Sequence, residues 1–148
     1  KIKNEKNAQE SIVFWAWKNK IPVIIPGFTD GSFGSQIWMH YQKDKSFMVN
    51  TLEDENLISD IIFKAKKTGA LMLGGGISKH HTIWWNQFRG GLDYAIYMTT
   101  AVDWDGSLSG AKLDEAISWG KINPKGKFIT VEGDVAILLP LIYSAYMH

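Results

Sequence analysis

The residue type best suited to covalent chemistry stands at position 121, where a lysine follows Trp119 and Gly120. A lysine held against an indole, with its amine shielded from water, can act as a nucleophile toward a carbonyl or imine carbon. Most lysines are instead solvated surface residues. The local sequence therefore leaves Lys121 as either a covalent nucleophile or a surface residue.

Two adjacent imidazoles, His80 and His81, follow Lys79 on a predicted helix. Adjacent residues point to different sides of a helix, so the pair lacks the i, i+4 spacing of two metal ligands. One imidazole is available to a bound ligand, or both are surface histidines. We expect no metal site.

Three consecutive glycines, Gly74, Gly75 and Gly76, stand between a predicted strand and that helix. Such glycines let the backbone approach a ligand closely, and a helix N-terminus favours phosphate groups. The run is neither a GxGxxG nor a P-loop pattern. It predicts either a nucleotide site or a tight turn.

The loop at residues 103–112 brings carboxylates and indoles together. Asp103 and Asp105 flank Trp104, and Asp114 and Glu115 follow shortly afterwards. This mixture suits a cationic, partly aliphatic ligand such as a polyamine. The alternative is a solvated acidic loop.

The elements that must position these residues alternate along the chain. Short apolar runs predict strands at residues 21–25, 70–73, 94–98 and 128–131. Helical patterns predict a helix opening at 30–32, one over 53–67 with Thr51 as its N-cap, others over 78–88 and 113–119, and a last helix capped by Asp134. Alternating strands and helices predict a parallel α/β sheet, which binds ligands beyond the carboxyl ends of its strands.

Composition and charge narrow the class of protein. The 148 residues, 45% of them apolar, predict a single globular domain over residues 1–148. A formal net charge of +1 predicts no nucleic-acid partner, and the lack of cysteine excludes thiolate catalysis. The longest apolar stretch, 135–147, is too short to span a membrane, and no signal-peptide pattern opens the chain, so we expect a soluble, cytoplasmic protein.

Four longer segments carry a resemblance to a known family. They read IPVIIPGFTDGSFG, TGALMLGGGISKHH, GGLDYAIYMTTA and DGSLSGAKLDEAISWGKI, in this order. Together they resemble the C-terminal half of deoxyhypusine synthase. The resemblance implies a Rossmann-like three-layer α/β domain, with a mostly parallel sheet and helices on both faces.

The activity that the resemblance implies is an NAD-dependent aminobutyl transfer. In the family, hydride transfer to NAD oxidises spermidine, and an enzyme lysine captures the butylimine fragment. The fragment then passes to a lysine of the translation initiation factor 5A precursor. The implied cofactor is therefore NAD, which carries the redox step while the protein supplies position and electrostatics.

The resemblance carries roles onto individual residues of this chain. It implies catalytic roles for Lys121, His80 and Glu115. The implied substrate-binding residues are His80, Tyr97, Asp105, Gly106, Ser107, Glu115 and Trp119. The implied NAD-binding residues are Asp30, Gly74, Gly75, Gly76, Thr100, Ala101, Asp134 and Val135.

Three positions depart from the family pattern. Leu108 and Ser35 stand where the family has aspartates on the polyamine side, and Trp84 stands where it often has asparagine. Each lost charge-assisted hydrogen bond removes roughly 1.5 to 3 kcal/mol of binding. The departures leave two alternatives open: a homospermidine synthase-type or other aminobutyltransferase with a small-amine acceptor, and a non-catalytic partner subunit.

The family's N-terminal half has no counterpart in the segments quoted above. We therefore expect a fragment, or one piece of a split or processed enzyme, that is inactive alone. The resemblance also implies self-association into a homotetramer, or pairing with a complementary N-terminal piece.

Overall fold

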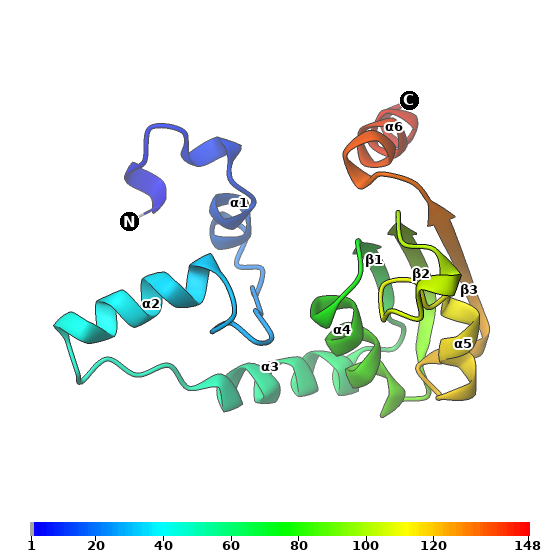
Figure 1. Ribbon diagram of the computed structural model, residues 1–148, viewed down its shortest axis with the longest axis horizontal. Coiled ribbons are helices and arrows are strands. Elements are labelled where there is room, and N and C mark those ends of the chain that lie inside the picture. Colours follow the sequence, from blue (N-terminus) through cyan, green and yellow to red (C-terminus); the bar gives the residue numbers. More distant parts are fainter. Residues whose placement is uncertain (1) are drawn as a thin grey trace.

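The computed structural model describes residues 2–148 and has an α/β fold (Figure 1). Three parallel strands, β1 (Gly69–Leu73), β2 (Leu92–Thr99) and β3 (Ile122–Glu132), form one sheet in the order β1-β2-β3. Helix α4 (Ile77–Gln87) connects β1 to β2, and α5 (Leu113–Ser118) lies between β2 and β3. Parallel neighbours require such crossover connections. The predicted α/β fold with a parallel sheet is confirmed.

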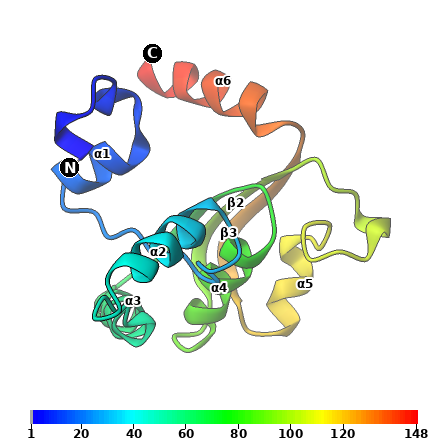
Figure 2. The ribbon, with the colours of Figure 1, turned by 60° about the vertical axis from the view of Figure 1, so that its left-hand side comes forward.

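The remaining elements flank this unit. They are α1 (Ile12–Lys18), α2 (Ser32–Lys43), α3 (Thr51–Lys64), α6 (Val135–Met147) and 3-10 turns at Ile2–Asn4, Ala8–Glu10 and Asp103–Asp105. Figure 1 shows α1 and α2 beside the sheet rather than upon it, with α3 leading from them toward β1. Figure 2 shows α6 projecting from the end of β3.

The hydrophobic core lies between one face of the sheet and the helices α4 and α5. Met72, Ala95 and Tyr97 contribute to it from the strands, and Ile83 and Leu113 from the helices. Tyr97 and Leu113 are completely buried. Because side chains alternate between the faces of a strand, these inward residues fix which face the helices cover.

The opposite face of the sheet carries exposed apolar side chains. Leu71, Ile96 and Ile129 are register partners across the three strands. They are 52%, 40% and 55% exposed, respectively. Parallel sheets are normally covered on both faces, so this row is an apolar surface that α4 and α5 leave accessible.

The strand predictions succeed for three of the four segments. Residues 70–73, 94–98 and 128–131 lie within β1, β2 and β3. The predicted buried strand at 21–25 is wrong, because that segment is extended without a ladder partner and Ile21 and Val23 are more than half exposed. Pro22 within the segment and Pro26 after it lack the N–H group that a strand interior must donate.

The helix predictions hold with small shifts at the ends. Helix α3 begins at Thr51, but its N-cap is Asn50, whose Oδ1 accepts a hydrogen bond from the Leu52 N–H at 3.2 Å. The predicted Thr51 cap is therefore wrong by one residue. The predicted Asp134 cap of α6 is confirmed, since its Oδ1 accepts from the Ala136 N–H at 2.7 Å.

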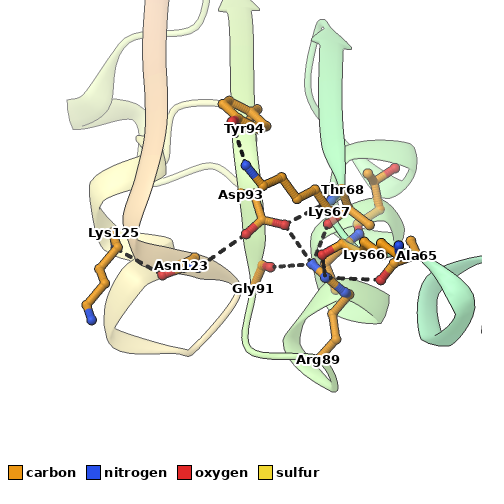
Figure 3. A network of polar contacts seen from close by, with 12 residues as sticks. Ala65, Lys66, Lys67, Thr68, Arg89, Gly91, Asp93, Tyr94, Asn123 and Lys125 are labelled. Carbon is orange, nitrogen blue, oxygen red and sulfur yellow. Dashed lines mark hydrogen bonds and ion pairs between the residues drawn. The ribbon is translucent and has the colours of Figure 1, made fainter.

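A polar network around Arg89 connects the segment before β1 to the start of β2 (Figure 3). The Arg89 guanidinium donates to Asp93 and Thr68 at 2.9 Å each, and to the Lys66 carbonyl at 3.1 Å. The Thr68 N–H donates to the Asp93 carboxylate, and this bond, followed by Arg89, lowers the pKa of Asp93. By binding the carbonyls of residues 65 and 66, Arg89 stabilises the non-helical turn there, and α3 ends at Lys64 rather than at the predicted residue 67.

Candidate functional site

A cavity of about 340 Å³ lies between α4, α5 and the end of the loop that precedes α5. We call it the lysine cavity. Its walls are Lys79, His80, Ile83, Leu108, Ala111, Lys112, Glu115, Ala116, Trp119 and Lys121. The three predicted catalytic residues, Lys121, His80 and Glu115, therefore line one hollow together with Trp119. A primary amine, an imidazole and a carboxylate at one place can perform nucleophilic and acid/base chemistry.

The turn between α5 and β3 positions Lys121. Gly120 adopts a φ of +67°, which favours glycine, and the Lys121 N–H donates to the Ala116 carbonyl at 3.0 Å. The Lys121 carbonyl accepts from the Leu92 N–H at 3.1 Å. The backbone of Lys121 is thus held by both α5 and β2.

Two indoles flank the Lys121 amine. Its Nζ lies 5.5 Å from the Trp119 ring centroid and 5.7 Å from that of Trp84. Indole faces attract ammonium groups at these distances. The same walls can therefore accommodate the ammonium group of a bound amine.

The two adjacent histidines have different partners, as their helical positions predict. The His80 ring lies 5.8 Å from the Trp84 ring and lines the lysine cavity. The His81 Nε2 lies 3.0 Å from a carboxylate oxygen of Glu55 in α3, whose other oxygen accepts from the Trp85 indole at 2.7 Å. His81 therefore joins α4 to α3, and His80 is the imidazole that faces the cavity.

Lys79 also lines the lysine cavity, although no sequence pattern predicted a role for it. It is only 3% exposed, and its Nζ donates to the carbonyls of Leu108 and Ala111 at 3.1 and 2.6 Å. Burial lowers its pKa to about 8, while the charge of Glu115 acts in the opposite direction. The signal that could have found it is helical spacing, because Lys79, Ile83 and Asn86 share the buried face of α4.

A second cavity, of about 380 Å³, opens at the carboxyl ends of the strands. We call it the glycine cavity. It is lined by Leu73, Gly74, Gly75, Thr99, Thr100, Ala101, Ser109, Gly133, Asp134 and Val135. Six of the eight predicted NAD-binding residues belong to this set. Asp30 and Gly76 do not, and Asp30 lies exposed in the turn before α2.

Gly75 permits a close approach of two chain segments in the glycine cavity. A Cβ atom built on Gly75 would lie 2.3 Å from the Ser109 Oγ and 2.5 Å from its Cα. The Ser109 carbonyl also accepts hydrogen bonds from the hydroxyls of Tyr97 at 2.5 Å and Thr99 at 3.2 Å. Ser109 is thus held between Gly75 and β2, and any side chain at position 75 would displace it.

The other predicted substrate-binding residues do not line the lysine cavity. Tyr97 lies fully buried beneath the loop that follows β2. Asp105, Gly106 and Ser107 stand on the exposed part of that loop. An ion pair of 2.6 Å between Asp103 and Lys112 closes its ends and raises the pKa of Lys112.

The three departures from the family pattern fall at different places. The Leu108 side chain lines the lysine cavity, and Trp84 stands beside Lys121. Ser35 instead lies in α2, where its hydroxyl donates to the Gly31 carbonyl at 3.0 Å. Leu108 therefore belongs to the walls of the lysine cavity, Trp84 adjoins the cavity through Lys121, and Ser35 lies elsewhere.

No group of three or more His, Asp or Glu side chains within residues 2–148 is placed to hold a metal ion. Among the helices described, none combines the length and apolarity that a membrane crossing requires.

The fold and these cavities define a parallel α/β protein with one cavity at its strand ends and a lysine-lined cavity beside it. The sequence profile described as "Deoxyhypusine synthase" matches residues 1–146, and the chain belongs to the deoxyhypusine synthase family.

Proteins named "Probable deoxyhypusine synthase" are similar to this chain over nearly all of its length. The protein from Thermoplasma acidophilum is 60% identical over 141 residues, which cover 95% of this chain and 46% of that protein. Those from Picrophilus torridus and Ignicoccus hospitalis are 60% and 52% identical, covering 95% and 94% of this chain and 45% of each relative. The chain therefore spans about half the length of these relatives.

Proposed function

We propose that the protein containing this chain is a deoxyhypusine synthase-type transferase. It moves the 4-aminobutyl group of spermidine to a lysine of the translation initiation factor 5A precursor in the cytoplasm, with NAD as cofactor. Family membership supports this proposal. The observation that carries it is the lysine cavity, which brings Lys121, His80, Glu115 and Trp119 together from α4, α5 and the turn before β3.

Each of these residues has a definite task in that reaction. The Lys121 amine adds to the C=N carbon of oxidised spermidine, and the bond from that carbon to the diaminopropane nitrogen breaks. Lys121 then holds the four-carbon fragment as an imine until the acceptor lysine displaces it. His80 and Glu115 line the same cavity, so they can exchange protons with the substrate amines and with the departing amine. Trp119 flanks the aliphatic and ammonium portions of the chain.

The glycine cavity has features that fit part of a dinucleotide. Gly74 and Gly75 present backbone without side chains, and Asp134 caps α6 at the same edge. Backbone N–H groups at a helix N-terminus favour phosphate, and a carboxylate suits a ribose hydroxyl. NAD would be held here by residues 74, 75, 100, 101, 134 and 135. The bound cofactor would supply the group that accepts and later donates hydride. Asp30 and Gly76 would join only in the complete assembly.

The exposed apolar surfaces support assembly with a further part of the protein or with other copies. The row Leu71, Ile96 and Ile129 is accessible on the sheet, and no residue of α6 is buried. Surfaces of this kind mark protein interfaces. We therefore include in the proposal that this portion is inactive alone. Activity then requires a homotetramer or the complementary N-terminal piece, and analytical ultracentrifugation of the complete protein would reveal the oligomeric state.

The test of the proposed activity is Lys121→Arg in the complete protein that contains this chain. Arginine keeps the charge but cannot form the imine, so we expect transfer from labelled spermidine to the factor 5A precursor to be abolished. Lys125→Arg, four residues further on and exposed, is the matched control and should retain activity. Full transfer by Lys121→Arg would refute the proposal. A wild-type protein that binds no NAD would favour the non-catalytic partner subunit instead.

Leu108 favours a second candidate, a homospermidine synthase-type enzyme whose acceptor is a small amine. An apolar side chain lines the lysine cavity where the family pattern has an aspartate, so the site offers one anionic contact fewer to a polycation. Competition between putrescine and the factor 5A precursor as acceptors separates the two candidates. Leu108→Asp should then tighten spermidine binding by roughly 10-fold, whereas the neutral Leu108→Asn should not.

A further inference from the structure

The loop at residues 103–112 has an end that separates the two cavities. Leu108 and Ala111 line the lysine cavity, and Ser109 between them lines the glycine cavity. We call residues 108–111 the dividing segment. A displacement of this segment would change the shape of both sites at once.

Lys79 of α4 holds the dividing segment from beneath. Its Nζ donates to the carbonyls of Leu108 and Ala111, at 3.1 and 2.6 Å, and lies 3.8 Å from the Tyr97 ring centroid. The hydroxyls of Tyr97 and Thr99 donate to the carbonyl of Ser109 in the same segment. Three consecutive elements of the fold, α4, β2 and the loop, therefore meet at one buried ammonium group.

Packing alone would not select a lysine at this position. A buried cation costs free energy that an apolar residue of similar length would avoid, and Lys79 is 3% exposed beside the buried Ile83. What the ammonium provides is directional bonding to two carbonyls of a segment that belongs to no helix or strand. The buried ammonium group of Lys79 therefore serves to stabilise the conformation of the dividing segment.

We propose that Lys79 is a positioning residue, which fixes the dividing segment between the two cavities by bonding the carbonyls of Leu108 and Ala111. It touches neither the transferred group nor Lys121 in this role. It acts through Leu108, which faces the amine substrate, and through Ser109, which faces the cofactor. This inference rests on the proposed function for its effect on catalysis, but its effect on the segment itself does not.

The first test is hydrogen exchange on the complete protein with Lys79→Met, which removes the donors and keeps the length. We expect amides of residues 109–112 to exchange about 10- to 100-fold faster, the effect of losing charge-assisted hydrogen bonds, while β1 and β2 keep their protection. Lys79→Arg, which keeps a cationic donor, should restore most of the protection. Lys67→Met is the matched control, since Lys67 also lies over a tyrosine of β2, Tyr94 at 5.7 Å, but is exposed.

Three results would overturn the assignment. Unchanged exchange at residues 109–112 would show that the segment does not depend on Lys79. Equal loss of protection in β1 and β2 would show that Lys79 supports the whole sheet rather than the segment. Failure of Lys79→Arg to restore any protection would show that the cation is not what matters.

A second readout separates this inference from the proposed activity. In Lys79→Met we expect KM for spermidine and Kd for NAD each to rise roughly 10-fold, with a smaller change in kcat. A fall in kcat alone would contradict a positioning role. If the wild-type protein transfers nothing, the proposed function fails, and the exchange experiment still decides the role of Lys79.

Discussion

The Nζ of Lys121 lies 5.5 Å from the Trp119 ring centroid, and this amine and the indole that precedes it by two residues line the same cavity. The left-handed turn at Gly120 produces this geometry, because it reverses the chain between the two side chains. Trp119 is 70% exposed and is therefore accessible to an incoming amine.

Replacing Trp119 tests whether its indole face binds the amine. In the complete protein, Trp119→Ala should raise KM for spermidine roughly 2- to 5-fold, the effect of one exposed cation–π contact, and Trp119→Phe should raise it less. Steady-state kinetics provide the measurement. Trp104→Ala is the control, since Trp104 is also exposed but lines neither cavity. Equal effects at positions 104 and 119 would contradict a binding role for Trp119.

The close approach of Gly75 to Ser109 leads to a prediction about cofactor binding. Gly75→Ala places a Cβ atom 2.3 Å from the Ser109 Oγ, so the dividing segment must move. We expect NAD affinity, measured by calorimetry, to fall by roughly 10-fold, as overpacking of this kind costs a few kcal/mol at most.

Gly69→Ala in β1 is the matched control for this substitution. Its added Cβ atom would meet Tyr94 at an ordinary 3.4 Å. NAD binding should therefore remain as in the wild type. If Gly75→Ala bound NAD as tightly as Gly69→Ala, the glycine cavity would not be the cofactor site.

The Arg89 network predicts a loss of stability without a loss of catalytic groups. The Arg89 and Asp93 side chains are 15% and 21% exposed, and Arg89→Met leaves the carboxylate without its guanidinium partner. The free energy of unfolding, measured by urea denaturation, should fall by more than it does when an exposed ion pair is broken.

An exposed ion pair provides the comparison. Lys64 and Asp60 form a 2.6 Å pair in which the side chains are 76% and 66% exposed. Lys64→Met should change the free energy of unfolding by less than about 0.5 kcal/mol. Similar losses in both variants would show that the network around Arg89 adds nothing beyond a surface contact.

The lowered pKa of Lys79 predicts a specific pH dependence of the free energy of unfolding. Burial lowers its pKa in the folded protein from 10.5 to about 8, opposed by Glu115. Between these pH values the unfolded chain binds more protons, so the free energy of unfolding rises with pH, by about 3 kcal/mol in total. Below pH 8 and above pH 10.5 this contribution is constant.

The difference between wild type and Lys79→Met isolates that contribution. His80, Lys112, Glu115 and Lys121 line the same cavity and are present in both proteins, so the difference removes the contributions that the two proteins share. Denaturation at a series of pH values should show the wild type gaining stability relative to the variant from pH 8 to 10.5. A difference that stays flat over this range would show that Lys79 is not a buried cation.

Local sequence patterns predicted the parts of the fold that depend on neighbouring residues. The alternation of strands and helices, the Asp134 cap and the different sides taken by His80 and His81 all follow from spacing over a few positions. The prediction of a strand at residues 21–25 was wrong because it rested on the apolar composition of the segment. Pro22 and Pro26 lack the N–H groups that a strand interior must donate.

Long-range contacts account for what the sequence did not predict. The Glu55 carboxylate meets His81 and Trp85 across 26 and 30 positions of sequence, and Lys79 meets Ala111 across 32. No periodicity specifies such pairs. The lysine cavity itself could be anticipated only through the family resemblance, which named Lys121, His80, Glu115 and Trp119 but not the buried lysine beneath them.

Borohydride trapping tests the central claim most directly. The complete protein is incubated with NAD and spermidine, reduced, digested and examined by mass spectrometry, with Lys121→Arg treated in parallel. We predict a 4-aminobutyl adduct on Lys121 in the wild type and none in the variant. A wild-type protein that binds NAD yet carries no adduct on Lys121, or carries it on another lysine, would contradict the proposed mechanism.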